Sequence, residues 1–595
     1  MILNALDWTI ILSFFTITLL IGLYAMKTAG KSTTEFFLSG RNMSWWLLGT
    51  SMVATTFSTD TPNLVTDIVR QNGVAGNWAW WAFLLTGMLT VFVYAKLWRR
   101  SNVMTDLEFY EIRYSGKAAA FLRGFRAIYL GAFFNIMVLA MISLALIKIG
   151  AVMLHWSALK TLAIMYTITA IYSALGGLRG VVLTDFIQFI VTMIGSVGAA
   201  IILLRLPQIG GITNMLAHGA VSTRLALLPD FSNMQELIPL FILPLAVQWW
   251  SVWYPGAEPG GGGYIAQRML SAKSERGALG ASLLFNVAHY ALRPWPWILV
   301  ALASLIVFPD IPSMVHAFPN IDPHIIRHDF AYPAMLSLLP NGMLGLVMAS
   351  LIAAFMSTAS THLNWGASYL VNDFYRRFVR PDATEKHLVF IGRVSTIALM
   401  IVSAILALAL KNALQAFQIL LQVGAGTGLI YILRWFWWRI NAYSEIVAMI
   451  ISFIVAIYFE FVHPITGLPI PSEAIKLLLG VGITTIVWLL ATFLTPPTRM
   501  DTLYTFYKRT RPGGPGWRYV FNSMKDDEVM EYQKDASDFP ISILCMVLGC
   551  FTVYAALFAT GYWIYGRWIL ASILTCFACI TAIGVSLLWR HLKFH

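Results

Sequence analysis

The chain of 595 residues is 58% hydrophobic and 11% charged, and its mean hydropathy is +0.72. No water-soluble class has this composition, so the sequence predicts a protein that lies in a lipid bilayer. The net charge of +12 is attributed to membrane topology and contact with anionic lipids, and it argues little for a nucleic-acid partner.

A membrane-spanning helix needs about 20 mostly apolar residues, and this criterion predicts about fifteen spans. They cover residues 8–26, 45–69, 78–98, 121–150, 158–175, 181–204, 237–272, 278–308, 334–372, 388–410, 412–438, 443–462, 474–495, 539–563 and 568–590. The first span begins near Met1 without a basic segment before it, so we interpret it as a retained helix rather than a signal peptide.

The spans divide the chain into seven parts. These are an extra N-terminal helix (1–30), a first set of five spans (44–206), an outer loop (207–236), a second set of five spans (237–440), two extra spans (441–496), a polar inner loop (497–538) and two last spans with a short tail (539–595). The four cysteines all fall in the last two spans, where a packing role is expected.

The positions of Lys and Arg predict the orientation, because cytoplasmic loops carry the excess of these residues. With the N-terminus outside, the odd number of spans places the C-terminus in the cytoplasm and most Lys and Arg on the inner side. In this assignment Arg293 is the lone cation deep within a span. We therefore predict a multi-pass protein of the plasma membrane, or of the inner membrane in a bacterium.

Two predicted spans are interrupted. The second contains SMVATTFSTDTPNLV (51–65), and the seventh contains WYPGAEPGGGGYIAQR (253–268). Hydrocarbon cannot pair backbone N–H and C=O groups, so a broken helix at membrane depth must be covered by protein or line a watery cavity. Interrupted segments at matching places of two halves point to the substrate and ion site of secondary transporters. The alternative is that 255–263 is an ordinary loop before a surface helix.

The two interruptions are five spans apart, so spans two to six and seven to eleven are expected to form two inverted repeats whose breaks meet in the middle of the bilayer. Glycine suits the second break, because it adopts backbone conformations that a larger residue disfavours. In the first break, Pro62 removes a backbone donor and clashes with the carbonyl of Ser58, which is expected to free acceptors near it.

Five separate passages resemble the sodium:solute symporter family, which contains sodium–glucose and sodium–proline carriers. They are EFFLSGRNMSWWLLGTSMVATTFS (35–58), TDLEFYEIRY (105–114), YSALGGLRGVVLTDFIQF (172–189), YIAQRMLSAKSERGA (264–278) and LIAAFMSTASTHLNWGASYLVNDFYRRF (351–378). The resemblance implies an all-α polytopic membrane protein with a five-plus-five inverted-repeat core of the leucine-transporter type. One extra N-terminal helix and about four extra C-terminal helices would flank this core.

Ala354, Ser357 and Thr358 share one face of a helix and offer a backbone carbonyl and two hydroxyls. The resemblance implies that these residues bind sodium together with the carbonyls of Ala54 and Phe57. On spacing alone, hydroxyls that bond to the carbonyls of their own helix are the more common outcome.

Asp185 lies within the sixth span, where a carboxylate is costly unless it is paired or hydrated. The resemblance implies a second cation site or an exit route for the ion. The alternative is a salt bridge to Arg179 at the end of the helix.

Three charged residues are candidates for the substrate site. Asp60 stands where sugar-carrying relatives have an acidic substrate-binding residue, and it is also placed to cap the half-helix that follows. Glu258 is ambiguous between gate, ligand and loop residue, and Arg293 is expected to pair with Asp60 or Glu258, to hold a substrate carboxylate, or to reach the membrane interface. Further candidate walls of the cavity are Asn77, Trp80, Trp81, Gln248, Trp253, Tyr254 and Tyr290.

Two departures from the family pattern put hexose specificity in doubt. The segment NWAWWAFLLTG lacks the glutamate expected of a glucose carrier, and Gly262 and Gly263 replace an Asn-Gln pair. The prediction is a sodium-driven symporter of a small polar organic solute, such as a sugar, amino acid or carboxylate, with Na⁺ as coupling ion and no organic cofactor.

Two alternatives to a sodium symporter stay open, a proton-coupled carrier that uses Asp185 and a nutrient sensor that signals through the polar inner loop. We expect a monomer or weak oligomer and no enzymatic activity, because the sequence shows no clustered metal ligands, nucleophile elbow or phosphate loop.

Overall fold

The computed structural model describes residues 3–154, 156–252, 258–319, 321, 323, 326–409, 426–469, 471–524 and 538–594. Within these ranges the protein is a helical bundle without a strand, and only an isolated bridge joins Met43 to Ala272. Ten of the described helices are long and apolar enough to cross a membrane by length and composition. The all-α prediction is confirmed, whereas the number of about fifteen spans stays a prediction.

The first half of the chain contains two interrupted or kinked segments among its long helices. In chain order its helices are α1 (Ala5–Ala29), α2 (Thr33–Leu38), η1 (Ser39–Arg41), α3 (Trp45–Thr55), α4 (Thr61–Asn72), η2 (Val74–Asn77), α5 (Trp78–Trp81), α6 (Leu84–Leu89), η3 (Thr90–Tyr94), α7 (Ala95–Ser101), α8 (Phe109–Arg113), α9 (Gly116–Ile128), η4 (Tyr129–Phe134), α10 (Asn135–Ile149), η5 (Gly150–Leu154), α11 (Ala158–Leu204), α12 (Ile212–Ala217) and α13 (Gly219–Ser222).

The second half begins with the other interrupted segment and ends with two long helices. Its helices are α14 (Met234–Leu237), η6 (Ile238–Ile242), α15 (Leu243–Ala246), η7 (Gln248–Trp250), α16 (Gly263–Ser271), α17 (Glu275–Val287), η8 (Ala288–Leu292), α18 (Pro294–Val307), α19 (Ile311–Ala317), η9 (His328–Phe330), α20 (Ala331–Leu336), α21 (Met343–Ser368), η10 (Tyr369–Val379), α22 (Glu385–Ala409), α24 (Gly428–Leu433), α25 (Ala442–Ile457), η11 (Tyr458–Val462), η12 (His463–Ile465), α26 (Glu473–Leu494), α27 (Met500–Thr510), η13 (Pro515–Trp517), α28 (Arg518–Asn522), α30 (Phe539–Ile564) and α31 (Trp568–Trp589).

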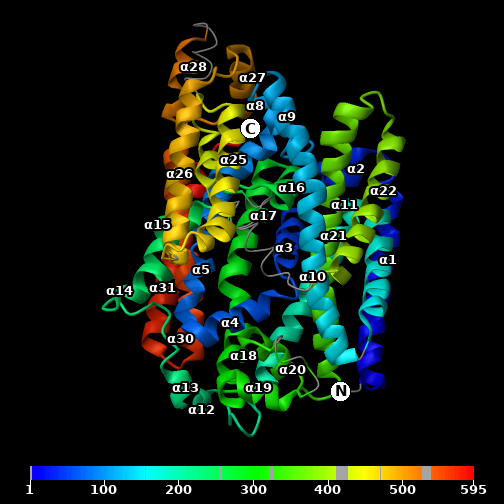
Figure 1. Cartoon of the computed structure of the whole chain (residues 1–595), viewed down its shortest axis with the longest axis vertical. Helices are drawn as coiled ribbons and strands as arrows, with labels where there is room; N and C mark the ends of the chain where they lie inside the picture. Colours follow the sequence, from blue (N-terminus) through cyan, green and yellow to red (C-terminus); the bar gives the residue numbers. More distant parts are fainter. Residues whose placement is uncertain are drawn as a thin grey trace.

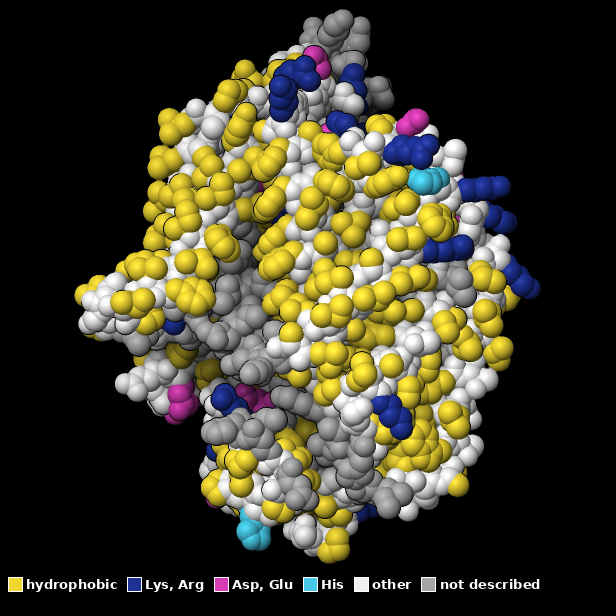
Figure 2. Space-filling model, turned by 45° about the vertical axis from the view of Figure 1, so that its right-hand side comes forward, with side chains coloured by type: hydrophobic (Ala, Val, Ile, Leu, Met, Phe, Trp, Pro, Cys, Tyr) yellow, Lys and Arg dark blue, Asp and Glu magenta, His cyan; other side chains and the backbone are white. Residues whose placement is uncertain are grey.

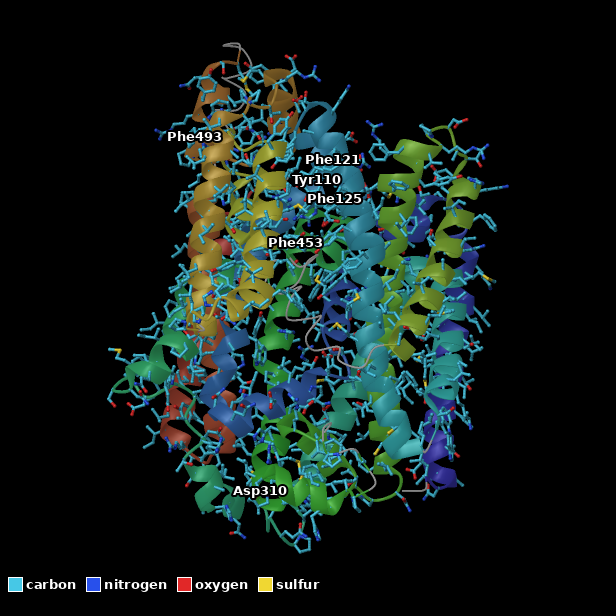
Figure 3. All side chains as sticks on the ribbon, in the orientation of Figure 1. Tyr110, Phe121, Phe125, Asp310, Phe453 and Phe493 are labelled. Atoms are coloured by element: carbon cyan, nitrogen blue, oxygen red, sulfur yellow. The ribbon has the colours of Figure 1, made fainter. Side chains whose placement is uncertain are left out.

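The long helices run between two ends of the molecule (Figure 1). One end, here the N-terminal face, carries the N-terminus, α12, α13, α19 and α20, and the other, here the C-terminal face, carries the C-terminus, α8, α27 and α28. Asp310 lies at the N-terminal face, and Tyr110 lies nearer the C-terminal face (Figure 3). In Figure 2 hydrophobic side chains cover most of the middle of the visible face, and most Lys and Arg lie in its upper half, nearer the C-terminal face.

Aromatic side chains stand on the outer surface of several helices, as expected for a lipid-facing surface. Phe121 and Phe125 on α9, Phe453 on α25 and Phe493 on α26 are all exposed, and Figure 3 shows them in the half nearer the C-terminal face. Exposed apolar residues on long helices are favourable in hydrocarbon and unfavourable in water.

The polar inner loop predicted for 497–538 folds onto the core where it is described. Trp517 of η13 is buried and donates from Nε1 to the Trp435 carbonyl (2.8 Å). The guanidinium of Arg113 lies over the rings of Phe506 and Trp517, at 5.4 and 5.0 Å. These contacts fix α27 and η13 against the short helix α8.

Gly177 divides α11 into two helices, which agrees with the two separate spans predicted at 158–175 and 181–204. Its backbone is at φ 54° and ψ −158°, a region that is open in practice only to glycine. A Cβ atom built there would lie 2.6 Å from the carbonyl oxygen of Phe36. Glycine therefore permits both the reversal of the chain and the close approach of α2.

We expect Gly177→Ala to destabilise the protein by about 2–4 kcal/mol, because alanine adds backbone strain and a steric clash. The measurement is the apparent Tm of the purified protein in detergent. Gly482→Ala on α26 is the control, since a Cβ there meets nothing within 4 Å and should change stability by no more than about 1 kcal/mol. Equal Tm values for the two variants would contradict this account of the kink.

Candidate functional site

The first interruption separates α3, which ends at Thr55, from α4, which begins at Thr61. Pro62 lies in the first turn of α4, where its missing N–H group costs nothing, and the Ser58 carbonyl accepts from Thr61 N (3.2 Å). The Ser58 carbonyl itself is therefore not free, and the acceptors near it that face a side chain are the carbonyls of Thr55 and Phe57. Asp60 takes the N-cap position as predicted, but its exposed carboxylate accepts from the Ser58 hydroxyl instead of capping the helix.

The end of α3 turns its carbonyl groups toward α21. Thr358 Oγ1 lies 3.1 Å from the Thr55 carbonyl oxygen and 3.4 Å from that of Phe57. It lies 3.1 Å from the carbonyl oxygen of Ala354, one turn earlier on its own helix. Four oxygen atoms of neutral groups thus converge where the end of α3 and the break meet α21, and such hard ligands suit a hard cation.

Ala54 and Ser357, the other predicted sodium ligands, lie beside this convergence. The Ala54 carbonyl accepts from Phe57 N (3.1 Å) at the end of α3. The Ser357 hydroxyl donates to Asp185 Oδ1 (2.7 Å). The structure therefore places the five predicted residues in one region, where α3 meets α21.

Asp185 on α11 is fully buried and forms the centre of a polar network. Its Oδ2 accepts from Ser51 of α3 (2.5 Å) and lies 3.7 Å from Nη2 of Arg268 on α16. The alternative prediction of a salt bridge between Asp185 and Arg179 is wrong, because Asp185 forms its ion pair with Arg268. The carboxylate thereby connects α11 with both interrupted segments.

Arg268 extends this network to α21, because its Nη2 also donates to Thr361 Oγ1 (2.6 Å) and its Nε donates to Ser51 Oγ (3.2 Å). Sequence reasoning missed this residue, although it lies in the passage YIAQR and in the predicted span 237–272, because hydropathy does not show which side chain pairs with Asp185. The expectation that Arg293 is the lone cation deep within the bundle is wrong, since Arg126, Arg268 and Arg434 are also buried.

The described part of the second interruption faces the C-terminal half of the bundle. Glu258 pairs with Arg126 of α9, and the Gly260 carbonyl accepts from Trp98 Nε1 (2.9 Å). Gly263 N, at the start of α16, donates to Asp106 (2.8 Å). Trp253 and Tyr254 lie outside the described residues. The burial and the ion pair of Glu258 disagree with a solvated loop residue, whereas its roles as gate or ligand stay predictions.

Arg293 is buried near the middle of the Glu275–Val307 segment. Its Nη1 donates to the Val53 carbonyl (3.2 Å) and to Thr56 Oγ1 (3.1 Å). The expected pairs with Asp60 or Glu258 are wrong, because neither carboxylate reaches this guanidinium and both have other partners. Burial also rules out the expected alternative of a side chain extended to the interface.

Two of the aromatic candidates lie close to one another beside the first break. The rings of Trp80 and Tyr290 are stacked with centroids 5.8 Å apart. His289 lies 5.6 Å from the Trp80 ring and 3.2 Å from Thr56 Oγ1. Together with Arg293, these residues form a group that we call the break-side cluster: Thr56, Trp80, His289, Tyr290 and Arg293.

The remaining candidates have local structural roles in this conformation. Asn77 donates to the Val74 carbonyl (2.9 Å) and accepts from Trp80 Nε1 (2.8 Å). Gln248 donates to the Ala79 carbonyl (2.8 Å), and Trp81 is buried against Phe558. Sequence patterns could not separate these residues from the break-side cluster, because the difference depends on tertiary contacts.

A helical membrane protein with two interrupted helices joined by a buried polar network belongs to the class of polytopic membrane transporters. The sequence profile of the sodium:solute symporter family matches residues 36–452. The chain belongs to the sodium:solute symporter family, and it is accordingly a transporter and not an enzyme.

Individual relatives agree with this assignment. The sodium/glucose cotransporter of Vibrio parahaemolyticus is 27% identical over 478 residues, which are 77% of this chain and 86% of the relative. The sodium/myo-inositol cotransporter 2 of Mus musculus is 25% identical over 499 residues, which are 77% of this chain and 70% of the relative. A solved Na⁺-coupled sialic acid symporter in its substrate-bound outward-open state shares the fold, with a TM-score of 0.69, 18% identity and coverage of 83% of this chain and 99% of that chain.

We expect Arg268→Gln to destabilise the protein by about 3–5 kcal/mol, because it leaves the buried carboxylate of Asp185 without its cation. The measurement is the apparent Tm in detergent. Arg376→Gln is the control, because its ion pair with Glu385 (3.4 Å) is partly exposed and should contribute less than about 1 kcal/mol. A loss no larger at Arg268 than at Arg376 would show that the network does not hold the helices together.

Proposed function

We propose that the protein is a sodium-coupled symporter that moves a small polar organic solute by alternating access. The convergence of the Thr55, Phe57 and Ala354 carbonyls on Thr358 Oγ1 carries this proposal. A sodium ion bound by Ala54, Phe57, Ala354, Ser357 and Thr358 would replace the hydrogen bonds that now join α3 to α21. Membership of the sodium:solute symporter family supports the choice of ion.

The ion and the solute are coupled through the first break. Sodium ties the end of α3 to α21, and the same turn of α3 supplies the Val53 carbonyl and Thr56 hydroxyl that hold Arg293. Fixing this turn prepares the break-side cluster for the solute. Coupling free energy is reciprocal, so the solute raises the affinity for sodium by the same factor.

Asp185 offers a second cation position or a step on the exit route. Its Oδ1 accepts from Ser357, so an ion that leaves the first site meets a carboxylate next. In this proposal the N-terminus is outside and the C-terminus is cytoplasmic, which is supported by the excess of Lys and Arg toward the C-terminal face (Figure 2). The exit route then leads toward the cytoplasm.

Buried ion pairs link the elements on the cytoplasmic side of the proposed site. Arg126 pairs with Glu258 of the second break, and Arg123 pairs with Asp373 of η10 (2.7 Å). We assign these contacts to a closed inner gate, which must separate before the solute can leave. The five-plus-five inverted repeat supplies the two bodies that move, with one broken helix in each.

The solute would bind at the break-side cluster, and Asp60, Asn77, Trp81, Gln248, Trp253, Tyr254 and Glu258 stay candidates for states in which the breaks rearrange. The relatives carry sugars and polyols by name. A hexose is not the favoured solute here, because the segment that holds Trp80 and Trp81 contains no acidic residue to bind sugar hydroxyls.

Uptake in proteoliposomes tests the coupling ion. We expect an inward sodium gradient to drive accumulation of the solute, whereas an equal potassium gradient or a pH gradient without sodium should not. The measurement is labelled-solute uptake across a panel of sugars, amino acids and carboxylates. Uptake driven by the pH gradient alone would favour the proton-coupled alternative, and uptake independent of any gradient would reject secondary active transport.

We expect the double substitution Ser357→Ala and Thr358→Ala to raise the sodium concentration for half-maximal stabilisation or transport about tenfold or more, because it removes two oxygen ligands. The measurement is the Tm as a function of sodium concentration at constant ionic strength, because a bound ion stabilises in proportion to ln(1 + [Na⁺]/Kd). Thr396→Ala, which removes a buried hydroxyl bonded within α22, should leave the sodium dependence unchanged. An unchanged dependence in the double variant would remove these residues from the site.

A further inference from the structure

The guanidinium of Arg293 uses only part of its hydrogen-bonding capacity. Both hydrogen bonds of this guanidinium are donated by Nη1, one to the Val53 carbonyl and one to the Thr56 hydroxyl. Its Nε is buried without a partner, and among the described residues Nη2 has no hydrogen bond. The edge formed by Nε and Nη2 is therefore free, and this edge matches the two oxygens of a carboxylate.

Other buried arginines without a carboxylate partner are used more fully. Arg70 donates from Nε to His328, from Nη1 to Ser304 and from Nη2 to the Phe308 carbonyl. Arg113 donates from Nε and Nη2 to carbonyls at the end of α24 and in the turn that follows. In both cases the Nε–Nη2 edge is occupied by protein atoms. Capping of a helix end accounts for these two residues, but it leaves one edge of Arg293 unexplained.

Several other buried arginines have carboxylate partners, which Arg293 lacks. Arg126 pairs with Glu258, Arg268 with Asp185, and Arg434 with Glu445 (3.5 Å). None of the ion pairs between described residues includes Arg293. The sequences 253–257 and 410–425, which lie outside the described residues, contain no Asp or Glu. The described residues therefore provide no counter-charge for this buried cation.

The surroundings of Arg293 stabilise a cation and offer apolar surface next to it. Its guanidinium lies 5.7 Å from the centroid of the Phe57 ring and 5.1 Å from that of Trp297. The stacked rings of Trp80 and Tyr290 belong to the same cluster, and Tyr290 precedes Arg293 by one turn of helix. A ligand that complements this arrangement has a negative charge at one end and a compact body that packs against aromatic rings.

We propose that Arg293 binds the carboxylate of the transported solute, so that the substrate class is a small organic carboxylate rather than a neutral sugar or polyol. The inference rests on the proposed transport function and specifies the chemistry of its solute. The Nε–Nη2 edge of Arg293 donates two hydrogen bonds to the carboxylate, and Trp80 and Tyr290 contact the rest of the molecule. Sodium and the carboxylate then act on opposite sides of residues 53–57, which couples a cation to an anion through one turn of backbone.

The first test uses pairs of compounds that differ in the carboxylate alone. Glucuronate is compared with glucose, lactate with 1,2-propanediol, and phenylacetate with 2-phenylethanol, each added to the full-length protein in sodium chloride. We expect at least one carboxylate to raise the Tm and its neutral partner to leave the Tm unchanged. Stabilisation by neutral compounds alone, equal stabilisation by both members of each pair, or no stabilisation by any carboxylate would overturn the proposal.

The second test uses variants of Arg293 with the stabilising carboxylate as probe. Arg293→Lys keeps the charge but loses the two parallel donors, so we expect about tenfold weaker affinity, and Arg293→Gln should weaken it about a hundredfold. Sodium should still stabilise Arg293→Gln, which shows that the variant folds. Arg70→Gln, a buried arginine on the neighbouring α4, should keep the affinity of the unmodified protein. Carboxylate affinity that survives Arg293→Gln, or falls equally in Arg70→Gln, would overturn the assignment.

Repeating both tests in potassium separates this inference from the transport proposal. Carboxylate binding that is equally strong in potassium would keep the anion site and reject sodium coupling. Sodium-driven uptake of a neutral solute, with no uptake of carboxylates, would keep sodium coupling and reject the anion site.

Discussion

A backbone N–H or C=O group that is left unpaired in hydrocarbon costs several kcal/mol, and this constraint determines how the two interrupted segments are built. The chain cannot stop a helix at membrane depth unless other groups take over its hydrogen bonds. At the first break the single donor of the Thr358 hydroxyl on α21 is shared between the nearby carbonyls of Thr55 and Phe57, and Arg293 donates to the Val53 carbonyl. At the second break Trp98 and Asp106 take the Gly260 carbonyl and the Gly263 amide. The groups that make the breaks possible are thus the groups that form the candidate site.

The ion pair of Asp185 and Arg268 likewise depends on polar side chains from neighbouring helices. Removing two charges from water costs several kcal/mol for each ion, and the attraction between them offsets this cost only when further hydrogen bonds are made. Ser51, Ser357 and Thr361 provide these bonds. Because the two charges come from α11 and α16 and these hydroxyls come from α3 and α21, the network is satisfied in one arrangement of the four helices. A change in the helices must exchange these contacts together, which is the property required of a two-state transporter.

The sequence was sufficient for the class of fold and for the location of the breaks, because both follow from composition and from local chemistry. Apolar length predicted the long helices, and Gly, Pro and small hydroxyl residues marked the interruptions at 51–65 and 253–268. The pairing of the charged residues was not predictable in this way. Arg268 was not singled out as a partner of Asp185, and Arg293 was expected to meet a carboxylate. Partners across 83 or 240 residues of sequence depend on how helices pack, and hydropathy carries no information about packing.

Helix α30 bears on the candidate site although it lies beyond the residues matched by the family profile. Tyr554 of α30 donates to the Trp81 carbonyl (2.8 Å), and Trp295 of α18 donates to the Leu557 carbonyl (3.1 Å). Both contacts reach segments next to the break-side cluster, because Trp81 follows Trp80 and Trp295 is two residues from Arg293. Gly561 allows the approach, since a Cβ atom there would lie 2.2 Å from the Trp295 ring. The helix α30 therefore packs against the two segments that position the rings of Trp80 and Tyr290 and the free edge of the Arg293 guanidinium.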